Sequence, residues 1–240
     1  MHIIIIGQGN VACNLHAAFL RKNIAVEMIS SYTGLDSIAQ NADVYIYAVQ
    51  DNALAEVIAK VHVPERAMHV HTSGTISLDV FGPDKPHCGI LYPFQSFSKA
   101  HILEDFSSIP TFIEAKGIDD ISAVYTLALT LTPHIYETTQ SDRERLHVAG
   151  VFANNFTNYM YAVAKEMLKG TQIPFKALLP LIDETAAKVH TLSPKEAQTG
   201  PAIRGDKNVI EHHLELIKDD KQKKLYRIIS ELISISGQVG

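Results

Sequence analysis

The sequence has few cysteines, no long apolar run and no cluster of basic residues, and each shortage excludes a class of protein. Two cysteines, Cys13 and Cys88, cannot build a disulfide framework, and their spacing matches no zinc site. No stretch approaches the roughly 18 apolar residues that a membrane-spanning helix needs. The net charge is −5, whereas nucleic-acid binding needs a concentrated cationic face. We therefore expect no membrane span, no nucleic-acid partner and no metal site.

The remaining composition is that of an ordinary globular protein. Hydrophobic residues make up 46% of the 240 residues and charged residues 20%, which suits one large domain or two modest ones. The apolar run at residues 3–6 lacks a basic segment and a cleavage site, so it does not indicate a signal peptide. We expect a cytoplasmic location.

Short apolar strands alternate with helices in the first half of the chain. The β-branched run at residues 3–6 is typical of a parallel strand that is buried on both faces. Further strands are predicted at 24–30, 43–49, 67–73, 88–93, 110–115 and 134–138, and helices at 10–22, 52–60 and between the last two strands. This alternation predicts a doubly wound α/β sheet of the Rossmann type over residues 1–139.

The second half, residues 140–240, contains no strand candidate and predicts an all-α domain. Ser141 and Glu144 form a capping-box pattern that opens a helix, and Gly170 is the expected C-cap. At roughly 28 residues this helix is long for a globular protein, and it is apolar on more than one side. Such a helix belongs in the centre of a bundle or at a dimer interface, and we expect a homodimer through the C-terminal domain. Further helices are expected at 174–190, 206–218 and 221–235.

A glycine turn joins the first strand to the first helix. Its residues Gly7, Gln8, Gly9, Asn10 and Val11, followed by an alanine, match the dinucleotide-binding pattern G-x-G-x-x-A. The first glycine permits the tight turn and the second lets the backbone approach a pyrophosphate. The helix N-terminus then presents free N–H groups to the phosphates. The alternative is a Rossmann-like domain that binds no nucleotide.

The ends of the next strands indicate which dinucleotide binds. NAD enzymes usually place an acidic residue at the end of the second strand, but this chain has Ser30 and Ser31 there, whose hydroxyls could contact a 2′-phosphate. We expect NADP, with NAD as the alternative, although the usual arginine is also missing. Val49, Gln50 and Asp51 end the third strand and should pass near the nicotinamide half.

Several longer stretches carry a family resemblance: VYIYAVQDNAL, HVHTSGTISLDVF, GILYPFQSFS, LHVAGVFANNFTNYM and TGPAIRGDKNVIEHHLELI. In this order they resemble the Rossmann-like proteins with the C-terminal helical domain of unknown function 2520, over nearly the whole chain. That family is similar to pyrroline-5-carboxylate reductases, prephenate dehydrogenases and 6-phosphogluconate-type dehydrogenases. The resemblance implies an NAD(P)-dependent oxidoreductase but no particular substrate. The chain departs from the family's Ser-Arg pair at Ser30-Ser31.

Two motifs at strand ends are candidates for substrate and nicotinamide contacts, because ligands of open α/β sheets bind at the carboxyl ends of strands. Thr72 and Ser73 could hold the nicotinamide amide, and Gly74 lies beside them. The alternative is a capped turn without a ligand. Tyr92 and Gln95 are the substrate candidates of the next strand. Tyr92 stands where prephenate-type enzymes have a histidine, and its expected role is a wall of the site.

His147 is the candidate acid/base on the long helix. It lies two α-helical turns before Asn154, so the two should share a face of the helix. Asn155 should lie close to the edge of that face. Hydride transfer to a carbonyl or imine requires a proton donor, and histidine suits neutral pH. The related 6-phosphogluconate-type enzymes use a lysine and an asparagine on the equivalent helix. The alternative is a hydrogen-bonded structural histidine.

The stretch TGPAIRGD at residues 199–206 contains R-G-D, which in a cytoplasmic protein has no receptor to meet. Its proline and glycines predict a loop, and Asp206 is expected to cap the following helix with its carboxylate. Arg204 either pairs with an acidic residue of its own domain or binds an anionic substrate or the cofactor.

Two functions remain from the sequence. The first is an NAD(P)-dependent reductase or dehydrogenase that acts on a small, anionic carbonyl or imine substrate. The second is a nucleotide-binding regulatory or scaffold protein without turnover. The fold alone cannot separate them, and His147 is the feature that favours the enzyme.

Overall fold

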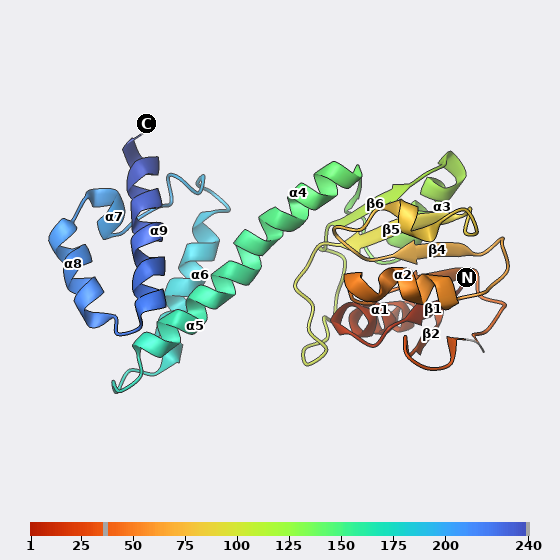
Figure 1. Cartoon of the computed structure of the whole chain (residues 1–240), viewed down its shortest axis with the longest axis horizontal. Helices are drawn as coiled ribbons and strands as arrows, with labels where there is room; N and C mark the ends of the chain where they lie inside the picture. The colour runs from red at the N-terminus through yellow and green to blue at the C-terminus, as the bar shows by residue number, and fades with distance from the viewer. Residues whose placement is uncertain (36–37, 239–240) are drawn as a thin grey trace. The chain divides into compact units, whose positions relative to one another are not determined.

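The computed structural model of the chain describes residues 1–35 and 38–238. It divides into two compact units, Met1–Asn154 and Asn155–Gly240, and most of their helices and strands are labelled in Figure 1. The first unit is an α/β domain that also contains the start of the long helix, and the second is all-α. Among the described residues between 145 and 235 none lies in a strand, so the predicted change from α/β to all-α is confirmed.

Within the described residues, seven strands form one sheet in the order β2-β1-β3-β4-β5-β6-β7. Their bounds are β1 His2–Ile6, β2 Ala25–Ile29, β3 Val44–Tyr47, β4 Met68–His71, β5 Cys88–Pro93, β6 Thr111–Ala115 and β7 Ile135–Glu137. Neighbouring strands are parallel except β5 and β6, which are antiparallel. Each predicted strand is therefore present.

The strand order reverses at β1. The chain passes from β1 to β2 on one side and then returns to place β3 on the other side of β1. Such a reversal leaves a crevice at the carboxyl ends of the two strands where the order switches, and ligands of open α/β sheets bind there. In this chain those ends lead into Gly7 and Ala48.

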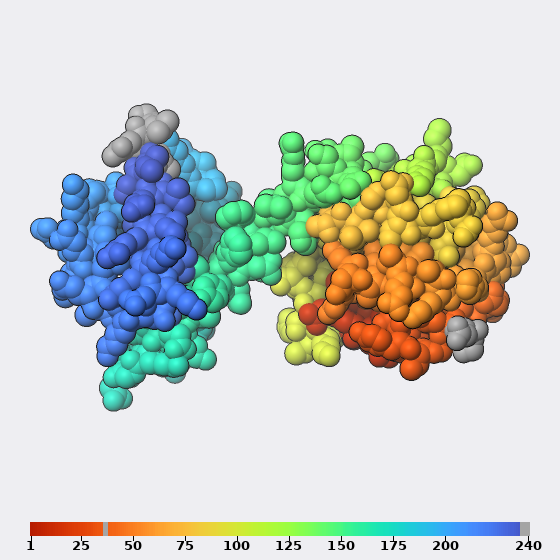
Figure 2. Space-filling model, viewed as in Figure 1, coloured from red at the N-terminus to blue at the C-terminus, as the bar shows by residue number. Residues whose placement is uncertain are grey.

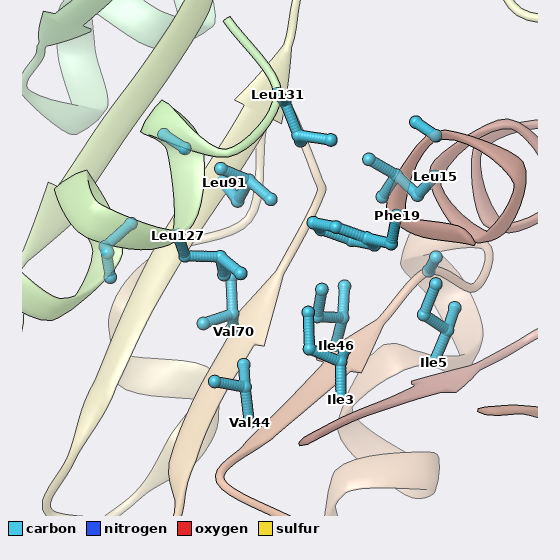
Figure 3. Packing of buried hydrophobic residues seen from close by; sticks show 14 of the residues in the cluster. Ile3, Ile5, Leu15, Phe19, Val44, Ile46, Val70, Leu91, Leu127 and Leu131 are labelled. Carbon is cyan, nitrogen blue, oxygen red and sulfur yellow. The ribbon is translucent and has the colours of Figure 1, made fainter. Parts of the chain in front are cut away.

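Helices cover both faces of the sheet, which explains why the strands are apolar on both sides. Helices α1 (Asn10–Arg21) and α3 (Ile118–Leu129) pack on one face, and α2 (Asp51–Lys60) and the 3₁₀ helix η2 (Leu78–Phe81) pack on the other. Figure 3 shows the first face, where Ile3, Ile5 and Ile46 meet Leu15 and Phe19 of α1. Ile4 and Ile6 lie in the core of the opposite face. A core on each face gives the strand ends a rigid support.

The long helix begins earlier than the capping pattern predicted, and it is not α-helical throughout. Thr139 caps helix α4 (Gln140–Gly150), because its hydroxyl accepts a hydrogen bond from the N–H of Asp142 and donates one to the Asp142 carboxylate. The prediction that Ser141 and Glu144 form the capping box was wrong. A π-helical stretch, η3 (Val151–Phe156), follows and leads into α5 (Thr157–Met167). Gly170 has a φ of 82° just beyond that helix.

The second unit continues with η4 (Phe175–Leu178), α6 (Leu179–Lys188), α7 (Pro201–Arg204), α8 (Lys207–Leu216) and α9 (Asp220–Gln238). The Ser234 hydroxyl of α9 donates a hydrogen bond to the carbonyl of Ala202 in α7. The predicted loop at 199–206 in fact contains α7, which Pro201 opens and Gly205 (φ 73°) ends. Asp206 precedes α8, but its carboxylate makes no capping hydrogen bond and pairs with Arg204 instead.

Among the residues that the structure describes, no helix combines the length and the apolar character needed to cross a membrane.

Candidate functional site

The glycine turn after β1 has the close backbone packing that the G-x-G-x-x-A pattern requires. Gly7 adopts a φ of 126°, and a Cβ there would lie 2.3 Å from the carbonyl oxygen of Ala48. A side chain at this position would therefore collide with the segment after β3. Gly9 is the N-cap of α1, makes no side-chain capping bond, and would place a Cβ into open space. The start of α1 thus faces a space that the backbone leaves free.

A cavity of about 470 Å³ lies over this turn. Ten residues that the sequence nominated as cofactor contacts line it: Gly7, Gln8, Gly9, Asn10, Val11, Ser30, Ser31, Val49, Gln50 and Thr72. They come from the carboxyl ends of β1 to β4. The cavity is also lined by Tyr32, Ala48, Ala53 and Lys99, which the sequence reasoning did not nominate. The strand reversal at β1 therefore coincides with a cavity large enough for part of a dinucleotide.

Two further nominated cofactor residues lie beside the cavity with their side chains engaged elsewhere. The Asp51 carboxylate accepts a 2.7 Å hydrogen bond from the Thr75 hydroxyl. The Ser73 hydroxyl accepts hydrogen bonds from the N–H groups of Thr75 and Ile76, which is the capped turn that the sequence left as an alternative. These side chains shape the loop after β4.

Tyr92 and His147 form a hydrogen-bonded pair next to that loop. The phenol oxygen of Tyr92, at the end of β5, lies 3.0 Å from Nδ1 of His147 on α4. Burial raises the pKa of the Tyr92 phenol to about 12, so it stays protonated at neutral pH. Gly74 makes this approach possible, because a Cβ at that position would lie 2.6 Å from His147 Nδ1. The loop therefore joins Thr72, which lines the cavity, to the Tyr92–His147 pair.

Helix α4 is anchored by Arg143, one turn before His147. The Arg143 side chain has no exposed surface and forms an ion pair with Glu114 of β6, with an N–O distance of 3.0 Å. Its guanidinium also donates hydrogen bonds to the carbonyl oxygens of Ser73 and Ile76. The buried guanidinium of Arg143 thus connects α4, β6 and the loop after β4. The sequence analysis missed this residue.

The remaining nominated residues are described by their own surroundings. The Gln95 side chain is exposed and accepts a hydrogen bond from the N–H of Ser96. Asn154 and Asn155 are exposed and lie in the π-helical stretch. A π-helical turn has more residues than an α-helical one, so the α-helical spacing that assigned His147 and Asn154 to one face does not apply. Arg204 binds the Asp206 carboxylate at 2.9 Å.

Comparisons with known proteins agree with this description. The family model described as "Domain of unknown function (DUF2520)" matches residues 109–233. A crystal structure of a candidate NADP oxidoreductase from Bacteroides fragilis is 41% identical, covers 97% of each chain and has a TM-score of 0.91. The chain belongs to the DUF2520 family. The family resemblance inferred from the sequence is therefore confirmed, as is the fold class.

More distant structures share the fold of this DUF2520 protein. A Thermotoga maritima protein is 20% identical, covers 98% of each chain and has a TM-score of 0.72. An imine reductase from Myxococcus stipitatus in complex with NADP⁺ is 12% identical, with a TM-score of 0.61; the match covers 98% of this chain and 92% of the reductase. A comparison with curated proteins found no match.

Proposed function

We propose that this DUF2520 protein is an NAD(P)-dependent oxidoreductase that reduces or oxidises a small, anionic carbonyl or imine compound. The observation that carries the proposal is the continuity of the loop after β4. Thr72 lines the cavity over the glycine turn, and two residues later Gly74 leaves room for the His147 imidazole, which a Cβ at that position would approach to 2.6 Å. A hydride from the bound cofactor and a proton from His147 would then be supplied at the two ends of one short loop. The regulatory alternative gives no reason for such a neighbouring acid/base group.

The cavity residues fit a nicotinamide dinucleotide. Gly7 and Gly9 let the pyrophosphate approach the backbone, and the uncapped start of α1 offers it N–H groups. The hydroxyls of Ser30 and Ser31 would contact a 2′-phosphate, so NADP is the proposed cofactor. Val49 and Gln50 would line the nicotinamide side, with Asp51, Thr72 and Ser73 around it. When bound, this cofactor would supply or accept the hydride.

His147 would supply the proton. The Tyr92 phenol shares a hydrogen bond with Nδ1 of His147, and this contact leaves the other ring nitrogen, Nε2, for the substrate. In its protonated form the imidazole would give its Nε2 proton to the substrate oxygen or nitrogen as the neighbouring carbon accepts the hydride, which leaves a neutral ring. Tyr92 would hold the orientation of the ring. Asn154 and Asn155 remain proposed catalytic partners of His147.

The substrate would contact Gly74, Tyr92 and Gln95, and Arg204 is the proposed clamp for its anionic group. Arg204 is exposed and already pairs with Asp206, which also agrees with the structural alternative for this arginine. Arg204→Lys separates the two roles, because lysine keeps the charge and loses the planar fork. A raised KM with an unchanged melting temperature supports the clamp. A wild-type KM in the lysine variant rules out the role of Arg204 as a substrate clamp.

We further propose a homodimer through the helical domain, residues 140–240, with residues 1–139 as the cofactor domain. The second unit buries few apolar side chains: among its described residues only Ala202 and Ile217 are buried hydrophobics. Leu181, Leu216 and Leu232 are each more than 60% exposed, and α9, which carries Leu232, lies at the surface in Figure 2. Exposed apolar patches of this kind usually mark interfaces.

Light scattering at micromolar concentration tests the assembly. We expect a species of twice the 26.5 kDa chain mass, and a monomer alone would remove the dimer. The proposed compartment is the cytoplasm, in keeping with the two free cysteines.

The acid/base role is tested with His147→Ala. This variant should bind NADPH with nearly wild-type affinity and lose turnover by about 10²–10⁴-fold, the usual effect of losing a general acid or base. His190→Ala, which changes an exposed histidine, is the matched control and should keep both properties. If His147→Ala loses affinity and turnover equally, or neither, His147 has a structural role.

A further inference from the structure

Lys99 lines the dinucleotide cavity although it is distant in sequence from the other residues around it. Those residues follow β1, β2, β3 and β4, whereas Lys99 belongs to the segment between β5 and β6. It is the one cationic side chain among the described residues that line the cavity.

Two asparagines of α1 hold the Lys99 segment. The Asn10 side-chain oxygen accepts a 3.0 Å hydrogen bond from the N–H of Lys99. One turn later, Asn14 donates to the carbonyl of Ser98 at 3.1 Å and accepts from the N–H of Leu103 at 2.9 Å. Asn14 has no exposed surface, so its amide is committed to this attachment. The segment is therefore fixed to the first turns of the helix that opens at the glycine turn.

No described carboxylate neutralises the Lys99 ammonium. Within the described residues 1–35 and 38–238, no acidic group lies within ion-pair distance of its Nζ, and the residue is exposed. The same cavity has no arginine at the position after β2 where NADP-binding proteins usually have one. A cation is thus held at the cavity rim by its backbone, with its charged end free to meet an anion.

We propose that Lys99 binds the pyrophosphate of the dinucleotide. This inference rests on the proposed function. The pyrophosphate is the favoured partner because Asn10, the first residue of α1, holds the Lys99 backbone, and helix N-termini attract phosphate. Lysine suits this role as a flexible point charge, which reaches a phosphate without the planar geometry of arginine. Asn10 and Asn14 act as positioning residues for it.

The test is a binding titration with NADPH and with NADH. The fluorescence of the reduced cofactor reports binding, because the chain has no tryptophan whose fluorescence could be used instead. Lys99→Gln should raise the Kd for both cofactors by the same factor, about tenfold, with an unchanged melting temperature. Because screening weakens exposed charges, raising the salt concentration should weaken binding less in this variant than in the wild type. Lys99→Arg should restore affinity to within about twofold of the wild type.

Lys22→Gln is the matched control, because Lys22 lies at the opposite end of α1 and does not line the cavity. It should leave both Kd values unchanged. Wild-type affinity in Lys99→Gln overturns the inference while leaving the proposed cofactor in place. A loss confined to NADPH also contradicts it, because the affected group would then be the 2′-phosphate. If the wild type binds neither cofactor, the proposed function and this inference both fail.

Discussion

The phenol oxygen of Tyr92 lies 3.0 Å from Nδ1 of His147, and this contact joins the end of a strand to a helix that follows much later in the chain. The sequence predicted that Tyr92 only forms a wall of the site, whereas here its hydroxyl contacts the candidate acid/base. The contact engages Nδ1, so Nε2 is the ring nitrogen left for proton transfer in the proposed reaction.

Tyr92→Phe removes this hydrogen bond and keeps the ring. We expect turnover to fall by up to about tenfold, because a hydrogen bond contributes roughly 0.5–1.5 kcal/mol and its loss lets the imidazole ring turn. The Kd for NADPH should stay at the wild-type value. Tyr136→Phe, in a half-exposed tyrosine of β7, is the control and should change neither quantity. Wild-type turnover in Tyr92→Phe would show that this tyrosine only forms a wall of the site.

The sequence predicts the parts of this site that depend on local pattern. The β-branched run at residues 3–6 and the glycines at 7 and 9 fix strand, turn and helix, because each feature acts through its own backbone. The predicted cavity residues Ser30, Gln50 and Thr72 follow from the rule that strand ends meet at one edge. Their placement needed only strand order.

Contacts between distant segments were not predictable in this way. Arg143 sits in a polar stretch that reads as the exposed start of a helix, and only the folded chain brings Glu114 and the Ser73 carbonyl to it. Lys99 reaches the cavity through asparagines whose partners lie 89 positions away. At Thr139 and at Asp206, several nearby polar groups could make the same hydrogen bond. The sequence pattern does not show which of these groups makes it.

Arg143→Met should strongly destabilise the first unit. It leaves the Glu114 carboxylate without its partner in a largely buried site, and breaking such a pair typically costs about 3–5 kcal/mol. Urea unfolding measures the loss. The double variant Arg143→Met with Glu114→Gln removes the unpaired charge and should recover at least about 1 kcal/mol relative to the sum of the single variants. Simple additivity would show that the ion pair does not couple the two residues.

Acid should destabilise the fold through two buried histidines of β4. Burial lowers the pKa of His69 and of His71 to about 4, whereas both take up protons near their ordinary pKa of about 6.5 once unfolded. The stabilisation is therefore complete above about pH 6.5 and declines as the pH falls toward 4. Full loss amounts to about 3 kcal/mol for each histidine.

Urea midpoints at pH 7.5 and pH 5 measure this effect. His71→Gln removes one titrating group and should reduce the drop between the two midpoints. His190→Gln, in an exposed histidine, should preserve it. An equal drop in wild type and His71→Gln would contradict the assignment.

The most direct test of the account is dinucleotide binding by Gly9→Asp. The backbone of Gly9 has a φ of −81° that any residue adopts, and a side chain there meets no other atom within 4 Å, so the fold should survive with an unchanged melting temperature. The new carboxylate would enter the cavity where the pyrophosphate is expected and repel it. We predict NADPH binding by the wild type, a modest loss in the neutral control Gly9→Ala, and at least a tenfold weaker Kd in Gly9→Asp. Wild-type affinity in Gly9→Asp would show that the dinucleotide does not bind at this turn.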